Sequence, residues 1–361
     1  MRKPPRSLRG DAGTSPLHAV VPYGPRGSSA RVRAFDWLEH TGLKAEVHAY
    51  LGLPVNSPRL VLRDPIDALR AEAHLLSLTR AVRHSTVLLV REASPFSRGH
   101  VEATLLRNAQ RGVYDFDDAL MVPAPGLVER VFSKSAKWRR SVTAADVVIA
   151  GNDLLAEAAT RAGAADVRLI PSCVEPADYR AKNDFDRHGP PTAVWLGSPA
   201  TEPYLESIAA ALLDVHRSHG LRLVVISAGT RSLGLPSSMM TRVDWSPDTN
   251  RQLADFDFGL MPLPDDPWTR GKCAYKLLQY GAAGLPMIGS PVGANHSALA
   301  AMGGFAAHGP DEWRDALVEL STMSQATLAE RGRCAREGVS RHYSFSAWAP
   351  SWLDAIGATG D

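Results

Sequence analysis

The sequence predicts an α/β protein made of two Rossmann-like, doubly wound domains that face a cleft. Short apolar runs alternate with amphipathic helical segments along most of the chain, and this alternation is typical of parallel sheets covered by helices. The chain of 361 residues is also longer than a single hydrophobic core usually supports. A polar stretch with Gly and Pro at residues 181–191 interrupts the alternation, which then restarts, and we expect this stretch to link the domains.

The first half of the chain predicts one domain at residues 17–185, after a disordered tail at residues 1–16. Strands are expected at residues 17–21, 44–50, 86–90, 112–116, 142–150 and 167–170. Helices are expected at residues 28–40, with Ser28 or Ser29 as the N-cap, and at 65–83, 101–110 and 153–162.

The second half predicts another domain of the same kind at residues 186–343. Strands are expected at residues 193–196, 221–226, 241–244, 256–261 and 285–288. Helices are expected at residues 204–219, 272–283, 311–320 and 328–339. The last segment, residues 344–361, contains a Trp-rich amphipathic stretch, and we expect a final helix there that crosses back to the first domain.

Charge and cysteine content restrict the classes of protein to consider. The net charge of +2 gives no indication of a nucleic-acid partner, although residues 1–185 hold 26 Lys and Arg against 20 Asp and Glu. That basic half indicates, weakly, an anionic partner. The three cysteines and the twelve histidines show no metal-ligand spacing. With neither a signal-peptide pattern nor a membrane-spanning apolar run, we expect a cytoplasmic protein.

The segment at residues 257–295 is the most informative part of the chain. It predicts a strand, a polar loop, a helix, a second strand and a Gly-rich turn, which together form a parallel crossover. Ligands of such sheets bind at the carboxyl ends of the strands, where loops of this kind lie. The loop is rich in Asp, Trp, Arg and Lys, which favours a phosphate-bearing ligand at the N-terminus of the helix.

Three sequence blocks carry a resemblance to a known family. They are VYDFDDAL at 113–120, AADVVIAGNDLLAEAA at 144–159, and GLMPLPDDPWTRGKCAYKLLQYGAAGLPMIGSPVGAN at 259–295. With the restarted β–α pattern, they resemble retaining, nucleotide-sugar-dependent glycosyltransferases of the GT-B fold, family 4 type. The resemblance implies transfer of a sugar from a nucleotide diphosphate sugar to a hydroxyl or amine acceptor, without a metal.

The same resemblance implies where the substrates bind. The donor would lie against the C-terminal domain and the acceptor against the N-terminal one. The implied co-substrate is a nucleotide diphosphate sugar, with a UDP-sugar slightly favoured, and no other cofactor. The acceptor would be a small molecule or lipid-linked, and peripheral contact with the inner membrane face fits the lipid-linked case. Natural-product tailoring and polysaccharide assembly both fit such a protein, and the oligomeric state stays open.

One departure from the family lies in the third block. The family has a Glu-x7-Glu motif, whose first Glu lies near the donor sugar and whose second holds the ribose. Gly271 and Gln279 stand at those two positions. The amide of Gln279 can still hydrogen-bond to ribose hydroxyls. Asp265 or Asp266 in the same loop could supply the missing contact to the sugar.

Asp117 and Lys272 are the candidate catalytic residues. Lys272, with the helix N-terminus and Arg270, would hold the leaving diphosphate; the alternative is that Lys272 and Lys276 form a solvated helix face. Asp117 stands where the family has a strand-end His, and it would contact the donor sugar or the acceptor. The alternative is that Asp117 and Asp118 cap the following turn. We expect no metal at Asp115 to Asp118, since paired carboxylates alone do not define a site.

The remaining candidates follow from position in the predicted loops. Gly27 and Ser28 lie in the small-residue loop after the first strand, where the family binds the sugar phosphate; a plain helix cap is the alternative. Trp245 would contact the base or is a packed surface aromatic. The donor-binding candidates are Gly27, Ser28, Ser198, Trp245, Arg270, Lys272, Lys276 and Gln279. The acceptor-binding candidates are Asp117, Asp118 and Arg91.

Two further alternatives stay open. The basic stretch at residues 129–140 predicts either contact with an anionic membrane or, more simply, a solvated helix face. The missing glutamates also leave room for a catalytically silent GT-B module that binds a sugar nucleotide or a partner. A nucleotide-sugar epimerase or hydrolase of the same architecture is the third reading.

Overall fold

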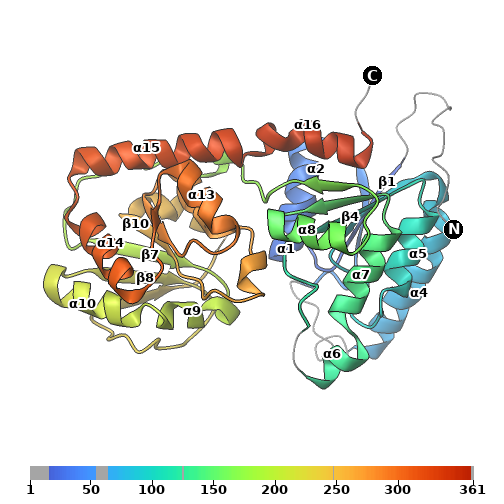
Figure 1. Cartoon of the computed structure of the whole chain (residues 1–361), viewed down its shortest axis with the longest axis horizontal. Coiled ribbons are helices and arrows are strands. Elements are labelled where there is room, and N and C mark those ends of the chain that lie inside the picture. Colours follow the sequence, from blue (N-terminus) through green and yellow to red (C-terminus); the bar gives the residue numbers. More distant parts are fainter. Residues whose placement is uncertain (1–15, 54–63, 124–125, 247, 359–361) are drawn as a thin grey trace.

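Two parallel six-stranded sheets, each covered by helices, form the molecule (Figure 1). The computed structural model describes residues 16–53, 64–123, 126–246 and 248–358. The expected tail at residues 1–16 lies almost wholly outside these residues. None of the helices in the described part of the chain has the length and apolarity that a membrane span requires.

The first sheet has the strand order β2-β1-β3-β4-β5-β6, with every neighbouring pair parallel. Its strands are β1 (Leu17–Val21), β2 (Ala45–Ala49), β3 (Thr86–Val90), β4 (Arg111–Phe116), β5 (Val147–Ala150) and β6 (Val167–Leu169). Its helices are α1 (Ser28–Ala30), α2 (Asp36–Thr41), α4 (Pro65–Ala81), α5 (His100–Asn108), α6 (Leu127–Val131), α7 (Lys134–Ala144) and α8 (Asp153–Arg161). A single π-helical turn joins α1 to α2.

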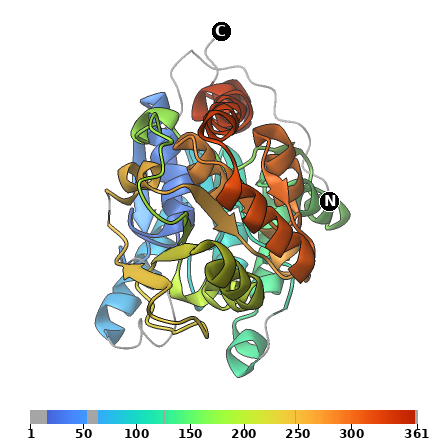
Figure 2. The ribbon, with the colours of Figure 1, turned by 90° about the vertical axis from the view of Figure 1, so that its left-hand side faces the viewer.

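The second sheet has the order β12-β11-β10-β7-β8-β9 and is also parallel throughout. Its strands are β7 (Thr192–Leu196), β8 (Arg222–Ile226), β9 (Met240–Val243), β10 (Phe258–Met261), β11 (Met287–Gly289) and β12 (Phe305–Ala306). Its helices are α9 (Pro203–Glu206), α10 (Ala209–His219), α11 (Thr249–Gln252), α12 (Tyr275–Ala282), α13 (Ala294–Met302), α14 (Pro310–Thr322) and α15 (Gln325–His342). Figure 2 shows this domain in front of the first.

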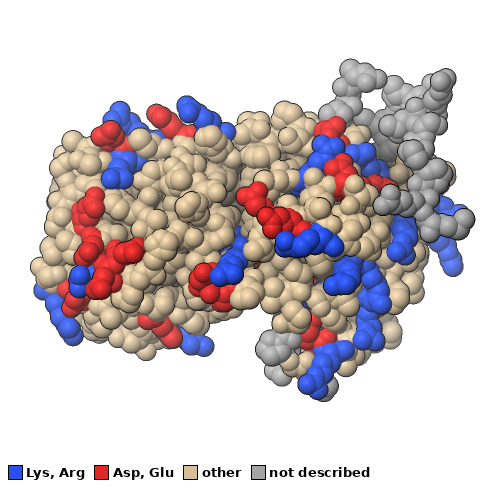
Figure 3. All heavy atoms as spheres, viewed as in Figure 1, with Lys and Arg blue, Asp and Glu red and all other residues tan. Residues whose placement is uncertain are grey.

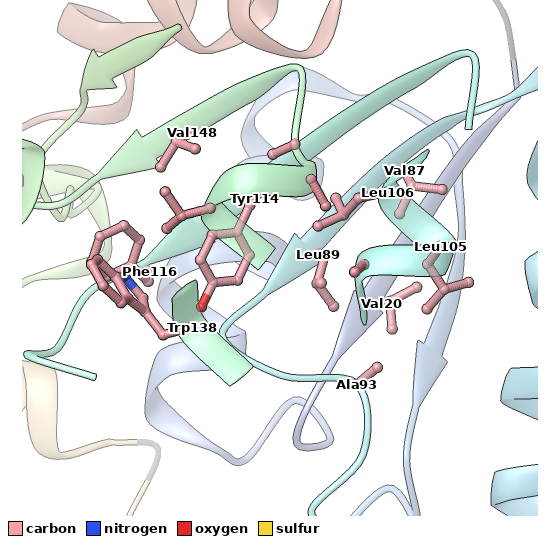
Figure 4. Packing of buried hydrophobic residues seen from close by; sticks show 14 of the residues in the cluster. Val20, Val87, Leu89, Ala93, Leu105, Leu106, Tyr114, Phe116, Trp138 and Val148 are labelled. Atoms are coloured by element: carbon pink, nitrogen blue, oxygen red, sulfur yellow. The ribbon is translucent and has the colours of Figure 1, made fainter. Parts of the chain in front are cut away.

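The core of the first domain shows why its strands read as continuous apolar runs. Both faces of a parallel sheet are covered, so β3 is buried at every position. Tyr114 and Phe116 alternate along β4 with Val113 and Asp115, which are buried on the other face of the sheet. Trp138 of α7 meets Phe116 edge-on at 5.9 Å between ring centroids. Figure 4 shows this packing. Burying such aromatic rings contributes the largest single hydrophobic terms to the domain's stability.

Some element boundaries differ from the predicted ones. The strand predicted at residues 142–150 begins only at Val147, because Val142 and Ala144 belong to the buried face of α7. Neither Ser28 nor Ser29 is the N-cap of the following helix; Gly27 is, and no side chain caps it. The helix predicted at residues 272–283 begins at Tyr275. Helix α13 was not predicted.

The two domains are joined twice. The chain crosses once near Val174, and Val174 and Tyr179 already pack with the helices of the second sheet. It returns at Tyr343, where the backbone N–H of Val174 donates to the carbonyl of Tyr343 at 2.9 Å. Helix α16 (Phe345–Ile356) then lies on the first domain, while α15 lies on the second (Figure 1).

A tyrosine hydroxyl joins two strands of the second sheet. Strands β7 and β10 pair only at their amino ends, through Ala193 and Val194. Further along, the hydroxyl of Tyr280 accepts from the N–H of Leu196 and donates to the carbonyl of Leu260, both at 3.1 Å. The ring needs Gly259 beneath it, since a Cβ there would lie 2.4 Å from the ring.

Candidate functional site

The candidate site lies where the carboxyl ends of β3, β4 and β5 meet the segment before α12. Strand β4 ends at Phe116, so Asp117 and Asp118 follow it directly, and Arg91 follows β3 in the same way. Parallel strands bring such strand-end residues to one edge of the sheet. The second domain supplies Lys272 and Lys276 from the start of α12. The sequence-predicted Arg91, Asp117, Asp118 and Lys272 are therefore brought together.

A chain of ion pairs links the two domains. The Arg91 Nη1 atom donates to Asp118 at 2.7 Å, and Lys272 Nζ donates to the other oxygen of Asp118 at 2.9 Å. Arg91 also approaches Asp117 at 3.4 Å and donates to the hydroxyl of Ser29 at 2.8 Å. Asp118 and Asp117 thus face cations, and neither caps the following turn as the alternative required.

The ion pairs set the charge states of this cluster. Burial alone would raise the pKa of Asp118, but Arg91 and Lys272 outweigh it and hold that pKa below its ordinary value. Burial would lower the pKa of Lys272, but the Asp118 carboxylate outweighs it and raises that pKa. Both groups are therefore charged around neutral pH. Only 14% of the Asp118 side chain and 23% of the Lys272 side chain are exposed, so solvent screens the pair weakly.

Arg91 is held in an unusual backbone conformation. Its φ of +60° lies in the left-handed region, which residues with a Cβ seldom adopt. The hydroxyl of Tyr114 donates to the Arg91 carbonyl at 2.9 Å, and the Arg91 N–H donates to the Asp115 carbonyl at 2.8 Å. Such strain concentrates at functional sites, where surrounding contacts fix a side chain in one orientation.

The segment from Gly271 to Cys273 packs tightly against the first domain. A Cβ added to Gly271 would lie 2.6 Å from the Cβ of Ala119. The Cys273 thiol donates to the carbonyl of Asp117 at 3.2 Å, and Asn152 donates to the Lys272 carbonyl at 3.1 Å. In this arrangement Ala119 fills the space beside position 271, so a glutamate side chain at that position has no room.

Lys276 lies one turn further along and is not paired in the same way. Its ammonium lies 5.3 Å from the ring centroid of Trp195, and no carboxylate of the described residues is within ion-pair distance of it. Burial, together with the nearby charge of Lys272, lowers the pKa of Lys276 to about 8. Neither Lys272 nor Lys276 belongs to a freely solvated helix face, which was the alternative reading.

Gln279 lies on the same helix, beside a pocket between the domains. It is 5% exposed, and its amide nitrogen approaches the side-chain oxygen of Asn250 at 3.5 Å. Asn250, Tyr275 and Arg31 line this pocket from both domains. Asn250 neither follows a strand directly nor belongs to one of the three sequence blocks, so nothing in the sequence was a reason to predict it.

The carboxylates considered as substitutes for the missing glutamate have local partners. Asp265 forms a two-fold hydrogen bond with Arg270, at 2.6 and 3.1 Å, on the exposed side of the loop. Asp266 accepts from the N–H groups of Trp268 and Thr269, both at 2.8 Å, and so fixes the turn before Gly271. Arg270 therefore lies with Asp265 rather than with the Lys272 cluster.

The candidate residues in the loops after β1, β7 and β9 differ in burial and in their contacts. Gly27 is required by packing, because a Cβ there would lie 2.3 Å from the Cβ of Tyr23. Ser28 is exposed, whereas the buried Ser29, which was not among the candidates, accepts the hydrogen bond from Arg91. Ser198 is exposed after β7, and Trp245 is 45% exposed rather than packed. Ser29 thus joins the loop after β1 to Arg91, whereas no side-chain hydrogen bond among the described residues joins Ser198 or Trp245 to Arg91, Asp118 or Lys272.

Buried ion pairs account for two charged residues that sequence position alone places on the surface. Arg33 is fully buried and grips Asp115 through two hydrogen bonds, at 2.7 and 2.9 Å. The Asp115 side chain is therefore paired with Arg33 in the core and does not share a site with Asp117. Lys137, in the basic stretch at residues 129–140, is 2% exposed and pairs with Glu92 at 2.5 Å. The exposed basic residues that remain lie over α6 and α7 (Figure 3).

Comparison with known proteins gives similarity at the level of structure. No family model and no curated protein matches the sequence. Among solved structures, sucrose-phosphate synthase from Thermosynechococcus elongatus matches with a TM-score of 0.70 at 14% identity, over 95% of this chain and 100% of that one. HepE from Anabaena, in complex with UDP and glucose, matches with 0.65 at 14%, over 96% and 100%.

The fold is GT-B. A UDP-forming α,α-trehalose-phosphate synthase from Burkholderia vietnamiensis also matches, with a TM-score of 0.63 at 12% identity, over 96% of this chain and 98% of that one. The GT-B fold predicted from the three sequence blocks is thus confirmed, and this chain spans nearly the whole length of these GT-B proteins. At such identities, the roles of individual residues do not follow from the comparison.

Proposed function

We propose that the protein transfers a sugar from a nucleotide diphosphate sugar to a hydroxyl or amine acceptor, with retention at the anomeric carbon. The observation that carries this proposal is the cluster of Lys272, Lys276 and Arg91 where the two GT-B domains meet. These three cations exceed the carboxylates of Asp117 and Asp118 by one charge. A diphosphate beside them would be attracted by this excess of positive charge.

The chemistry needs stabilisation of a leaving diphosphate. Lys276 has no ion-pair partner among the described residues, so its ammonium is the first candidate to receive the diphosphate. The diphosphate would then compete with Asp118 for Lys272, and the N-terminus of α12 adds partial positive charge. As the bond to the sugar breaks, the diphosphate itself can take the acceptor proton, so no further protein base is needed.

The acceptor would bind on the first domain. A small pocket beside Arg91 is lined by Glu92, Leu120, Lys134 and Lys137. Asp117, released in part from Arg91 when the diphosphate binds, would orient the acceptor hydroxyl or the donor sugar. This role is positioning and electrostatic stabilisation. HepE is in complex with UDP and glucose, and the trehalose-phosphate synthase is UDP-forming, so a UDP-sugar is the first donor to test.

The deciding experiment measures nucleotide release from a panel of UDP-, GDP- and dTDP-sugars, with and without hydroxyl and amine acceptors. Release that requires the acceptor, with an α-linked product from an α-linked donor by NMR, supports transfer with retention. Release without an acceptor indicates hydrolysis, and an inverted product contradicts retention.

Replacement of Lys272 tests the phosphate assignment. Lys272→Ala removes one cation from the diphosphate and should weaken donor binding by tenfold or more, about 1.4 kcal/mol. Isothermal titration calorimetry with UDP-glucose, or with whichever donor the panel selects, measures this change. The control is Lys44→Ala, which removes an exposed lysine at the start of β2. Equal donor affinity in both variants would sink the assignment.

A second candidate function has its own observation. Both motif glutamates are absent, and Ala119 fills the space beside Gly271. A GT-B module that binds a sugar nucleotide without turnover would show this combination. Donor binding with no release for any acceptor in the panel would favour it over transfer.

A further inference from the structure

One face of the edge strand β2 and its neighbour β1 carries three potential metal ligands. In the parallel register, His18 pairs with Glu46, and His48 pairs with Val20. Alternate residues of a strand share a face, as do register partners, so His18, Glu46 and His48 all project from the same face of the sheet. Helix α4 lies over that face, since its Glu72 accepts a hydrogen bond from Tyr50 at 2.8 Å.

The distances between the ligand atoms fit one ion. His18 Nδ1 lies 3.0 Å from His48 Nε2. Oε2 of Glu46 lies 3.5 Å from His18 Nδ1, and its other oxygen, Oε1, lies 3.7 Å from His48 Nε2. A tetrahedral Zn²⁺ with bonds of roughly 2.0–2.1 Å spaces its ligand atoms about 3.3–3.4 Å apart. Shifts of a few tenths of an ångström, on the order of ordinary side-chain motion, would place all three atoms around one ion.

A neighbouring histidine supports this arrangement. His48 Nδ1 lies 3.1 Å from Nε2 of His74, on α4. When Nε2 of a histidine binds a metal, Nδ1 carries the proton and donates it to an acceptor, which fixes the ring's tautomer and orientation. His74 is placed to be that acceptor. The site thus has the outer hydrogen bond that metal-bound histidines usually have.

Burial distinguishes this group from a chance surface cluster. His18 and His48 are each 8% exposed, so their rings are held by packing rather than by solvent. The Glu46 side chain is 67% exposed and leaves a path for an ion from solvent. Three protein ligands with an open side would leave the fourth position to water.

We propose that His18, Glu46 and His48 bind a divalent transition-metal ion, Zn²⁺ foremost, which ties β1 to the edge strand β2. Imidazole nitrogens with one carboxylate suit Zn²⁺, Ni²⁺ or Cu²⁺ rather than Mg²⁺ or Ca²⁺. The site lies at the edge of the first sheet and not among the strand ends of β3, β4 and β5, so its role is structural. His18 lies on a different strand from Glu46 and His48, so spacing along the chain did not reveal the group.

The test is zinc binding by untagged protein stripped with EDTA. Calorimetric titration with ZnCl₂ should show one ion bound per chain, and saturating Zn²⁺ should raise the Tm by a few degrees, since an ion that binds only the folded state stabilises it. Co²⁺ should give the visible absorption of a four-coordinate site. Absence of stoichiometric binding overturns the proposal.

Two variants locate the ion. Glu46→Gln changes an exposed side chain and leaves the packing intact, and His48→Gln removes a buried ligand. Each should weaken Zn²⁺ affinity tenfold or more and abolish most of the Tm rise. The control is His219→Gln, an exposed histidine at the end of α10, which should bind Zn²⁺ as the unaltered protein does. Undiminished Zn²⁺ binding in the folded Glu46→Gln protein overturns the assignment.

Discussion

Lys272 precedes α12 and Lys276 lies in its first turn, and their surroundings give them different properties. Lys272 has a carboxylate partner in the other domain, so its pKa is raised. Lys276 has Trp195 beneath it and Lys272 beside it, so burial and repulsion lower its pKa to about 8. Of the two, only Lys276 titrates near physiological pH. Its protonation is therefore linked to the binding of any anion at the site.

We predict that donor affinity falls as the pH rises through about 8. Because a diphosphate favours the charged ammonium, donor binding raises the pKa of Lys276 and takes up a proton. Affinity should be greatest below the pKa of the free protein and should decline by several-fold to tenfold between about pH 7 and pH 9. Calorimetry with UDP-glucose across this range measures it, and Lys276→Met should flatten the curve. A curve of equal slope in that variant would contradict the assignment.

The burial of charged side chains could not be predicted from residue type. Arg33 and Lys137 lie on helices in a polar pattern, so the sequence favours a surface position for both. The structure buries each against a single carboxylate, Asp115 or Glu92, from a different strand end. A pairing across roughly 45 to 80 residues of sequence leaves no local pattern. In contrast, the strand-end aspartates were predictable because a buried strand immediately precedes them.

At the scale of elements, most strands and helices follow from apolar periodicity. β3 was predicted to the residue because every position in it is buried. Helices α14 and α15 were predicted from the regular repeat of their apolar faces, with ranges that are one to three residues short at each end. Predicted boundaries were wrong where neighbouring elements share an apolar run. Val142, for example, was predicted to belong to a strand but belongs to α7. The predicted start of α12 was wrong because Ala274 has a left-handed backbone conformation, with φ of +55°. An alanine in the sequence does not indicate such a conformation.

Helix α16 packs on the first domain through aromatic contacts of Phe345 and Trp352. Trp352 is fully buried and stacks on Trp37 of α2, with 5.0 Å between ring centroids and an interplanar angle of 2°. Arg111 of β4 also donates to the carbonyl of Ala355 at 2.8 Å, near the helix end. The helix therefore closes one end of the first domain's core although it is last in the chain.

We predict that Trp352→Ala lowers the free energy of unfolding by about 3–5 kcal/mol, since it removes a large buried side chain and leaves a cavity. Urea denaturation followed by circular dichroism measures this loss. Trp245→Ala provides the matched control, because Trp245 is 45% exposed and its removal should change stability little. Equal effects of the two substitutions would mean that α16 contributes no packing energy.

At the scale of the whole molecule, the domains meet through close packing as well as charge. Gly271 contacts Ala119, and Cys273 contacts Gly151. The side chain of Asn152 donates a hydrogen bond to the Lys272 carbonyl. Position 271, where the sequence resemblance places the family's first glutamate, is thus part of an interdomain contact. This accounts for the departure in physical terms, because only a residue without a Cβ fits beside Ala119 here.

We predict that Gly271→Ala separates the domains. The added Cβ would lie 2.6 Å from Ala119, so the contact must open or the backbone must shift, at a cost of about 1–3 kcal/mol. Small-angle scattering should show a larger radius of gyration than for the unaltered protein. The control is Gly189→Ala, where a Cβ would meet no atom within 4 Å. An unchanged radius with full stability would show that the contact yields without domain movement.

The Tyr280 hydroxyl couples helix α12 to the sheet of the second domain. Tyr280 lies on α12, and its oxygen replaces a missing backbone pairing between β7 and β10. The spacing of these two strands is therefore set by a side chain of the helix that carries Lys276, a candidate anion-binding residue. A ligand that displaced α12 along its axis would strain both hydrogen bonds at once. Loss of that hydroxyl, as in Tyr280→Phe, would uncouple the helix from the sheet and leave an amide and a carbonyl without a partner in a dry interior.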